Sequence, residues 1–551
     1  MTCPYATSRF FGLGVVGTTL AIDAGVNVNT TTPNIRGRVL GIATSHAEVL
    51  LGLDAHAVRV EVSSTRGPSF FQMVGLAEAA VRESRVRVSS ALARLGHLLD
   101  EYAITVNLAP ADLRKNGATL DLAIAVAALA AIHRLPEESI SATISFSGSC
   151  LSRDVCSRFA ACFRCCSAQN ARAGNAPSCP RATEPRPGWS TESRCSSLEI
   201  FEAVVRHLRG IDVLPRPERK AYTPSSFGED RDFSEVRGQA AARRALEIAA
   251  AGMHNLLFVG PPGGGKTLLA RLMPTILPPL EFDEAIEVTA VHSVAGLVDP
   301  EAGVISHRPF RAPHHSVSEA GLVGGGEFPR PGEISLAHHG VLFLDELAEF
   351  RRPALEALRQ PLEDGTVHIA RARARAFFPA RPLLVTAVNP CPCGYHGHPV
   401  RSCQCSAQQR SRYLGRLSGP LLDRIDLHCA VPPVDVGALS TARVGESSLV
   451  VRVRVVAARQ LQSRRCSEGL VSAVNNARLS LPEAEYVCRL DGAARGLVHK
   501  AFARLGLSAR AYLRILRVAR TIADLDGAER VSEAQIAEAI QGRLVDRDGG
   551  L

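Results

Sequence analysis

The chain has 551 residues, of which 46% are hydrophobic and 21% charged, so it is long enough for about three globular domains and too apolar for a disordered protein. No apolar run reaches about 18 residues, which argues against a membrane-spanning helix. The N-terminus lacks the small-residue cleavage site of a signal peptide, so we expect a cytoplasmic protein. The net charge of +9 hints at an anionic partner, but residues 141–197 alone supply four of these charges.

The segment 38–140 alternates strand-like and helix-like patterns. "HAVRVEVSS" and "YAITVNLAP" show the period-two alternation of strands, whereas "AEAAVRESRVRVSSALARLG" and "LDLAIAVAALAAIHRL" predict an amphipathic and a buried helix. We therefore expect a small α/β domain here. Residues 1–37 form an N-terminal extension.

Residues 141–197 have a different character, with no sustained hydrophobic period, seven of the fifteen cysteines and the only tryptophan. One interpretation is an irregular linker. Another is a metal-binding insert, although the spacing C-x5-C-x5-C-x2-C-C suits no common zinc site. A third interpretation depends on a family resemblance and is given below.

Regular patterns return after this segment. Residues 198–233 contain the helix-like "SLEIFEAVVRHLRG" and a linker, and 234–436 open with a helix, a strand, a glycine-rich loop and a helix, as in parallel α/β nucleotide-binding domains. Residues 437–551 read as helical throughout. Ser532 and Gln535 form a capping-box pair at the start of the last predicted helix.

The stretch "GPPGGGKT" matches the P-loop pattern between an apolar strand and a helix. Its glycines let backbone N–H groups surround phosphates, Lys266 neutralises the β and γ charges, and Thr267 binds Mg²⁺ at a helix N-terminus. The predicted nucleotide-binding residues are Gly260, Pro261, Pro262, Gly263, Gly264, Gly265, Lys266 and Thr267.

Polar residues end two later apolar strands. In "GVLFLDELAEF" an apolar strand ends in Asp345 and Glu346. We expect Asp345 to hold Mg²⁺ and Glu346 to polarise the attacking water. Acidic residues at strand ends are common, so this reading depends on the P-loop upstream. "RPLLVTAVNP" ends in Asn389, expected to orient water or the γ-phosphate, with a simple turn before Pro390 as the alternative.

Two arginines are candidates for contacts with the γ-phosphate. Arg424 lies between Asp423 and Asp426, where it is either a surface ion pair or an arginine finger that reaches a neighbouring subunit's nucleotide. A later helix places three arginines on one face, Arg510, Arg514 and Arg517. We expect Arg510, near the helix N-terminus, to reach the nucleotide and the other two to be solvated.

Four cysteines cluster in the short loop after Asn389: Cys391, Cys393, Cys403 and Cys405. Four thiolates are the right ligand number for tetrahedral zinc, with His396 and His398 as substitute ligands. The C-x-C spacing is less diagnostic than C-x2-C, and neighbouring reduced cysteines in a loop are the alternative.

These motifs resemble a known family. The runs "GMHNLLFVGPPGGGKT", "RPFRAPHHSVSEAGLVGGGEFPRPGEISLAHHGVLFLDEL" and "SGPLLDRIDLH" are similar to those of magnesium-chelatase-like AAA+ ATPases of the YifB/ComM type, over 38–140 and 197–545. The resemblance implies a ring, expected to be hexameric, with ATP at subunit interfaces and Arg424 acting in trans. The ComM branch promotes branch migration during recombination of incoming DNA, so DNA is the expected partner.

The stretch "VHIARARARAFFPARPLLV" predicts a hairpin just before the Asn389 strand. A strand would place Arg371, Arg373 and Arg375 on one face, and a ring would present six such faces to the phosphate backbone in its pore. The alternative is a solvated charged hairpin.

The N-terminal domain resembles the Lon-protease-like (ribosomal S5 domain 2-like) fold, which raises the alternative of a protease. Lon-type proteases have a serine in a Gly-Pro-Ser-Ala-Gly-like turn, but here "RKNGATLDLAIA" has Leu120 near that position and no serine. Lys115 therefore lacks a nucleophile to activate. We interpret the domain as an assembly or DNA-guiding module.

Over 141–197 the family's glycine-rich strand pattern is absent, although the resemblance resumes in register afterwards. We interpret the segment as the product of two compensating frameshifts, which translation of its codons in the other two frames would test. By the same resemblance, residues 1–37 precede the usual family start and are expected to come from an upstream start codon.

The expected fold is thus α/β, with a P-loop AAA+ domain and a helical C-terminal lid after the Lon-protease-like domain. The expected function is that of an ATP hydrolase that uses Mg²⁺ to drive DNA branch migration in recombination or natural transformation. The alternatives are a magnesium-chelatase motor subunit that acts with a porphyrin-metallating partner, and an ATP-dependent ring scaffold without DNA activity.

Overall fold

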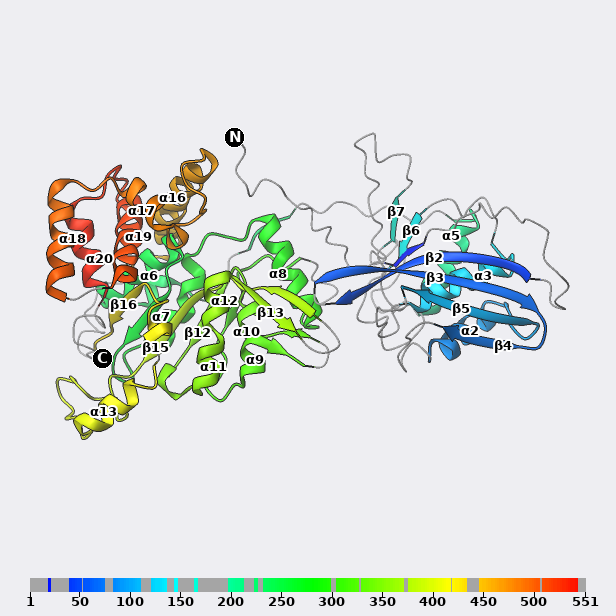
Figure 1. Ribbon diagram of the computed structural model, residues 1–551, viewed down its shortest axis with the longest axis horizontal. Coiled ribbons are helices and arrows are strands. Elements are labelled where there is room, and N and C mark those ends of the chain that lie inside the picture. The colour runs from blue at the N-terminus through cyan, green and yellow to red at the C-terminus, as the bar shows by residue number, and fades with distance from the viewer. Residues whose placement is uncertain are drawn as a thin grey trace. The chain divides into compact units, whose positions relative to one another are not determined.

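The computed structural model of the chain (Figure 1) forms two compact units, and each is considered by itself. The N-terminal unit lies within 12–221, and the C-terminal unit comprises the described residues from 222 to 297 and from 304 onward. The structure describes residues 18–20, 39–51, 53–74, 83–110, 120–135, 143–146, 163–166, 197–212, 222–225, 231–298, 304–326, 329–370, 375–417, 419–433, 445–505 and 508–543.

A four-stranded sheet is the base of the N-terminal unit, in the order β2-β3-β5-β4. β2 (Val39–Leu51) and β3 (Asp54–Arg66) form a long antiparallel hairpin, β5 (Tyr102–Ala109) runs antiparallel to β3, and β4 (Phe70–Val74) runs parallel to β5. Alternate residues of β5 are buried, as the period-two pattern predicts. The two strands predicted from this pattern are confirmed.

The helices of this unit supply the rest of its core. All eleven residues of α3 (Asp121–Ala131) are buried, so this helix is the central one, and it packs against β2 and β3. α2 (Ser84–Arg94) and α5 (Ser197–Leu208) add Leu92 and Phe201 to the same core. Within the described residues, the helices predicted from the sequence are confirmed.

This unit also contains a small antiparallel sheet of β1 (Thr18–Leu20), β6 (Thr143–Phe146) and β7 (Phe163–Cys166). The rest of segment 141–196 lies outside the described residues. The frameshift interpretation therefore stays a prediction.

The C-terminal unit is built on a five-stranded parallel sheet in the order β16-β8-β15-β12-β9. Its strands are β8 (Leu256–Val259), β9 (Phe310–Arg311), β12 (Val341–Leu344), β15 (Leu383–Val388) and β16 (Leu427–Ala430). β12 and β15 are buried along their whole length, because helices and loops cover both faces of a parallel sheet. The P-loop strand β8 lies between β15 and β16, and β15 separates it from β12.

Helices and short hairpins surround this sheet. The hairpins are β10 (Gly324–Gly325) with β11 (Arg330–Pro331), and β13 (Thr366–Ala370) with β14 (Arg375–Pro379). The helices are α6 (Ala240–Gly252), α7 (Lys266–Ile276), α8 (Phe282–Val294), α9 (Glu319–Val323), α10 (Glu333–Leu336), α11 (Arg352–Ala357), α12 (Arg359–Asp364), α13 (Ala407–Leu414) and α14 (Gly419–Leu422). Single 3₁₀ turns span Phe233–Glu235 and Leu347–Glu349.

From residue 445 onward the described residues are helical, as predicted. The helices are α16 (Ser448–Ser467), α17 (Leu481–Cys488), α18 (Gly492–Leu505), α19 (Ala509–Leu525) and α20 (Glu533–Gln541), with a 3₁₀ turn at Asn476–Arg478. Ser532 and Gln535 form the predicted capping box of α20. Across the described residues, no helix combines the length and the hydropathy needed to cross a bilayer.

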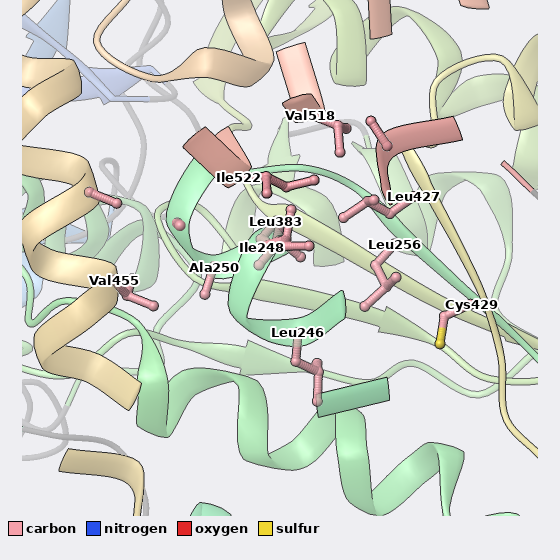
Figure 2. Packing of buried hydrophobic residues seen from close by; sticks show 14 of the residues in the cluster. Leu246, Ile248, Ala250, Leu256, Leu383, Leu427, Cys429, Val455, Val518 and Ile522 are labelled. Carbon is pink, nitrogen blue, oxygen red and sulfur yellow. The ribbon is translucent and has the colours of Figure 1, made fainter. Parts of the chain in front are cut away.

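One continuous apolar core joins these helices to the sheet. Figure 2 shows Leu256, Leu383 and Leu427 of three strands near Ile522 of α19, and Val455 of α16 lies in the same cluster. α6 contacts both α16 and α19. The helical lid is therefore packed onto the helix that precedes the P-loop strand.

Candidate nucleotide-binding site

The P-loop follows β8 and leads directly into α7, which begins at Lys266. Gly263 and Gly265 have φ angles of 80° and 81°, a backbone conformation that residues with a side chain rarely adopt. A Cβ on Gly260 would lie 2.1 Å from the carbonyl oxygen of Val431, which follows β16. The glycines are thus required both for the turn and for the close approach of a neighbouring strand.

Lys266 points back into this loop and is 8% exposed. Its ammonium donates to the carbonyl oxygens of Gly260 (2.7 Å) and Pro261 (2.9 Å) and to Oδ1 of Asn389 (3.0 Å). Burial lowers the pKa of Lys266, while the nearby carboxylates of Asp345 and Glu346 partly offset this effect.

Thr267 and Asp345 meet across the carboxyl edge of the sheet. The Thr267 hydroxyl donates to Oδ2 of Asp345 at 2.7 Å, and Oδ1 of Asp345 accepts the backbone N–H of Glu346 at 2.9 Å. Glu346 has a φ of 52°, and its half-exposed carboxylate lies 3.5 Å from Nδ1 of His315. The strained turn directs one carboxylate toward Thr267 and leaves the other accessible.

The strand order explains why Asn389 joins this group. Because β15 lies between the P-loop strand and β12, its carboxyl end places Asn389 between Lys266 and the two acidic residues. The simple-turn alternative for Asn389 does not account for its bond to the Lys266 ammonium.

These residues fit a magnesium-bound nucleoside triphosphate. Backbone N–H groups at a helix N-terminus and a lysine ammonium suit phosphates, and a hydroxyl beside a carboxylate suits Mg²⁺. When such a ligand is bound, Lys266 would hold the β and γ oxygens, and Thr267 and Asp345 would hold the metal.

The two arginines expected to contact the γ-phosphate, Arg424 and Arg510, pair with groups of their own chain. Arg424 donates to the carbonyl oxygen of Pro420 (2.7 Å) and pairs with Glu363 of the same chain. Arg510 is 69% exposed and pairs with Asp423 at 3.4 Å, one residue before Arg424. Both residues therefore lie near the short α14 segment.

The expectation that Arg514 and Arg517 are solvated is wrong. Arg514 is 9% exposed and its Nε lies 3.5 Å from Asp426, while Arg517 donates to the carbonyl oxygen of Leu479 at 2.7 Å. Spacing along a helix shows which residues share a face, but the acceptors that this face meets are Asp426, just before β16, and Leu479, just after the 476–478 turn.

Two residues near the site were not predicted. Gln239, with a φ of 51°, donates through Nε2 to the carbonyl oxygens of Gly264 (3.2 Å) and Pro432 (3.1 Å) and so supports the P-loop. His315 lies next to Glu346. The pair of adjacent histidines in "RAPHHSV" could have drawn attention to His315. No sequence pattern, however, links His315 to Glu346, which is 31 positions away.

The four loop cysteines come together in the structure. Cys391, Cys393, Cys403 and Cys405 have ligand atoms within 4.8 Å of one another, and Cys391 is fully buried. Burial raises the pKa of Cys391 to about 12, whereas hydrogen bonds from backbone N–H groups lower that of Cys393 to about 6. This arrangement can supply four sulfur ligands to one ion.

A second cluster of metal-type ligands, Glu287, His338 and His339, does not fit a metal. Nδ1 of His338 accepts the backbone N–H of Arg381 at 3.1 Å, so the neutral ring carries its proton on Nε2, which faces Glu287 at 2.8 Å. A metal-binding histidine instead donates through its second nitrogen. This cluster is a hydrogen-bonded network.

The predicted hairpin before β15 is present as β13 and β14, with Ala370 paired to Arg375. Arg375 is exposed, and Arg371 and Arg373 lie outside the described residues. The same face carries His368 and the half-exposed Phe377, whose rings meet edge to face at 4.7 Å.

Comparison with known proteins identifies the family. Residues 232–439 match the family described as magnesium chelatase, subunit ChlI, 445–543 match its C-terminal family, and 60–150 match subunit ChlI of Mg-chelatase. YifB of Escherichia coli (strain K12) is 41% identical over 517 residues, which cover 92% of this chain and 98% of YifB. The chain belongs to the magnesium-chelatase-like family of the YifB/ComM type.

Other relatives agree with this YifB/ComM-type assignment. Competence protein ComM of Haemophilus influenzae (strain Rd) is 41% identical over 515 residues, 92% of this chain and 98% of ComM. Lon protease 2 of Bacillus subtilis (strain 168) is 29% identical over 179 residues, 30% of each chain. The fold is thus α/β, with a P-loop AAA+ domain, a helical lid and a Lon-protease-like domain, and the protein is an ATPase-type enzyme that uses a nucleotide and Mg²⁺.

The Lon likeness does not bring a protease site within the described residues. Leu120, near the position of the nucleophile, is fully buried at the start of α3, and Lys115 lies outside the described residues.

Proposed function

We propose that this YifB/ComM-type protein hydrolyses ATP to drive branch migration or remodelling of DNA in recombination or natural transformation. The observation that carries the proposal is a group of side chains at one sheet edge, where Lys266, Asn389 and the Thr267–Asp345 pair meet. Similarity to a competence protein along 92% of the chain supports the choice of DNA as the substrate.

In the proposed site each residue has a separate task. Lys266 neutralises phosphate charge, Thr267 and Asp345 hold Mg²⁺, and Glu346 accepts a proton from the attacking water. Asn389 orients this water or the γ-phosphate. The free side of the Glu346 carboxylate, which is 53% exposed, leaves room for the water.

The proposed motor is a homo-oligomeric ring, with six subunits as in the resemblance noted above. Arg424 would then act on the nucleotide of a neighbouring subunit, where its charge stabilises the transition state. This role requires Arg424 to exchange Glu363 for phosphate oxygens. Arg510 would likewise exchange its partner Asp423 for the nucleotide.

We assign DNA contact to the β13–β14 hairpin. Arg375 begins β14, and Arg371 and Arg373 lie in the sequence between β13 and β14, outside the described residues. His368 and Phe377 beside Arg375 add aromatic surface, and aromatic rings next to cationic groups suit single-stranded DNA. This proposed substrate implies that the protein works in the cytoplasm, with the Lon-like domain guiding DNA or assembly.

The proposal also includes one structural zinc ion in the loop after β15. Cys391, Cys393, Cys403 and Cys405 would be its ligands, since four thiolates within 4.8 Å of one another favour zinc among the common divalent ions.

The test is ATP hydrolysis by the purified chain without DNA, with single-stranded DNA and with a four-way junction. We expect DNA to stimulate hydrolysis, and Glu346→Gln to abolish the stimulated rate. Hydrolysis that ignores DNA would contradict the proposal and favour the ring scaffold or, if a porphyrin-metallating partner stimulates it, the chelatase motor.

The DNA surface has its own test, which is independent of hydrolysis. Arg375→Glu is expected to weaken junction binding by about tenfold and to reduce its salt dependence, because it removes a phosphate contact. Arg464→Glu is a matched control, since Arg464 is 67% exposed on the lid helix α16. Equal losses in both variants would show a nonspecific charge effect.

A further inference from the structure

The four cysteine sulfurs after β15 lie within 4.8 Å of one another, close enough to bind one metal ion. Sγ of Cys391 lies 3.3 Å from Sγ of Cys393 and 3.6 Å from that of Cys403, and Cys393 and Cys403 are also 3.6 Å apart. A tetrahedral zinc with Zn–S bonds of about 2.3 Å separates its sulfurs by about 3.8 Å. The observed distances are too long for disulfides, which require about 2.05 Å.

The backbone wraps around the buried sulfur. The N–H of Gly394 donates to the carbonyl oxygen of Cys391 at 2.9 Å, and the N–H of His396 donates to Sγ of Cys391 at 3.3 Å. Gly394 has a φ of 82°, which allows this tight turn. Such N–H groups stabilise negative charge on a sulfur ligand.

This turn lies directly against the P-loop. A Cβ on Gly394 would come within 2.6 Å of Cδ of Pro262, so the backbone of the cysteine loop and the ring of Pro262 are already in contact. Asn389, whose Oδ1 accepts a hydrogen bond from the Lys266 ammonium, is only two residues before Cys391. One end of the loop therefore touches two parts of the nucleotide site.

The other end of the loop is also tied to this site. Cys405 leads into α13, whose N-cap is Ser406, and Arg410 of α13 donates to the carbonyl oxygen of Cys405 at 2.9 Å. Just after α13, Arg416 pairs with Glu349 at 3.1 Å, three residues beyond Glu346. The loop thus connects the P-loop, Asn389 and the segment that follows the proposed base.

We propose that zinc held by these four thiolates couples metal occupancy to nucleotide binding, because it fixes the loop against Pro262 and so positions Asn389 and the P-loop. The inference rests on the proposed zinc ion and on the proposed ATP-binding function. In the absence of metal only weak thiol contacts would join the four sulfurs to one another, and the contact between Gly394 and Pro262 would loosen.

The first measurement is the metal content of the full chain, purified under reducing conditions, by elemental analysis. We expect about one zinc per chain, since the site has four ligands, and we expect Cys403→Ser and Cys405→Ser to lose it. Cobalt(II) added to the zinc-free chain should give the visible absorption of tetrahedral thiolate coordination. Cys466→Ser is the control, because Cys466 lies in α16 and its sulfur contacts the carbonyl oxygen of Ser472.

The second measurement is the affinity for a fluorescent ATP analogue. Cys403→Ser and the chelator-treated wild type should bind it at least about fivefold more weakly, the lower end of typical coupling energies. Gly394→Ala keeps all four ligands but should show the same loss, because its Cβ would push against Pro262 and strain a turn whose φ is 82°. Circular dichroism and thermal melting of each variant show whether it is folded.

The outcomes separate the claims. Wild-type protein without zinc overturns the metal site, and zinc-bound protein whose metal-free form and Gly394→Ala variant keep full affinity overturns the coupling. If the wild-type chain holds zinc but binds no ATP analogue, the proposed ATPase function fails, whereas the metal site stands on its own measurement. A Cys403→Ser chain that does not fold leaves the chelator-treated wild type and Gly394→Ala to decide.

Discussion

The ammonium of Lys266 donates a 3.0 Å hydrogen bond to Oδ1 of Asn389, although 123 positions separate the two residues. Lys266 begins the helix after β8, and Asn389 directly follows β15, which is the next strand in the sheet. The hydrogen bond therefore forms because β8 and β15 are neighbours in the sheet. It also places a neutral amide between Lys266, the proposed phosphate-binding group, and the carboxylates of Asp345 and Glu346.

Replacing Asn389 by alanine should lower kcat for ATP hydrolysis by about 10- to 100-fold with a smaller change in KM, because in the proposed site the amide acts in the transition state. Steady-state kinetics with and without DNA would measure this. Asn389→Asp has the same shape but adds a negative charge beside the phosphates, and we expect it to be at least as inactive. Wild-type kcat in both variants would rule out a role for the amide.

Replacing Glu346 by glutamine should reduce the rate of hydrolysis by about 100-fold or more, since the amide cannot accept the proton of the attacking water. Binding of a fluorescent ATP analogue should remain within about twofold of wild type, because Glu346 does not hold phosphate or metal in the proposed site. Lys266→Ala is the contrasting variant, for which binding itself should fail. A Glu346→Gln enzyme with normal turnover would assign the base elsewhere.

Asp426 is the centre of a buried network that connects the sheet to the lid. Its Oδ2 lies 3.1 Å from Nδ1 of His254, its Oδ1 lies 3.5 Å from Nε of Arg514, and Nε2 of His254 lies 2.8 Å from the hydroxyl of Thr521. Burial raises the pKa of Asp426, but the hydrogen bond from His254 and the charge of Arg514 outweigh it and hold the pKa below its usual range.

Asp426→Ala should therefore destabilise the C-terminal unit by about 3–5 kcal/mol, because it leaves the buried Arg514 charge without its main partner. Asp423→Ala is the matched control, since Asp423 is 39% exposed and its ion pairs with Arg510 and Arg514 are 3.4 and 3.9 Å long. It should cost less than about 1 kcal/mol. Equal unfolding midpoints in urea for the two variants would refute the special role of the buried carboxylate.

The stability of the folded chain should fall as the pH decreases from about 6.5 to about 4, in part through His338. Burial lowers the pKa of His338 to about 4. In this pH range the unfolded chain binds a proton that the folded chain does not, so acidification favours unfolding, by an amount on the order of 1–3 kcal/mol for one such histidine.

His338→Asn keeps an acceptor for the Arg381 N–H but cannot titrate, so its stability should depend less on pH over this range. Urea unfolding of both proteins at about pH 7.5 and about pH 5 would give the two slopes. Burial also lowers the pKa of His428, to about 3, and this contribution remains in both proteins. Identical slopes would show that His338 does not contribute.

Most single elements of the fold were predictable because their signals are local. The buried helix α3 is apolar at nearly every position, the P-loop needs glycines at positive φ, and β12 and β15 are short apolar runs with polar residues after them. The predicted strands and helices that fall within the described residues are present. The surroundings of Arg514 and Arg517 were not predictable, because their acceptors lie far away in the sequence.

The sequence by itself thus determined the elements, the P-loop and the residue types able to bind nucleotide, Mg²⁺ and zinc, because these depend on spacing within one element or loop. Only the tertiary structure decided which of them meet. The order β16-β8-β15-β12-β9 brings Asn389 next to Lys266, and the packing of the cysteine loop brings Gly394 against Pro262. Strand order and loop packing result from burying apolar surface across the whole unit, which no local pattern encodes.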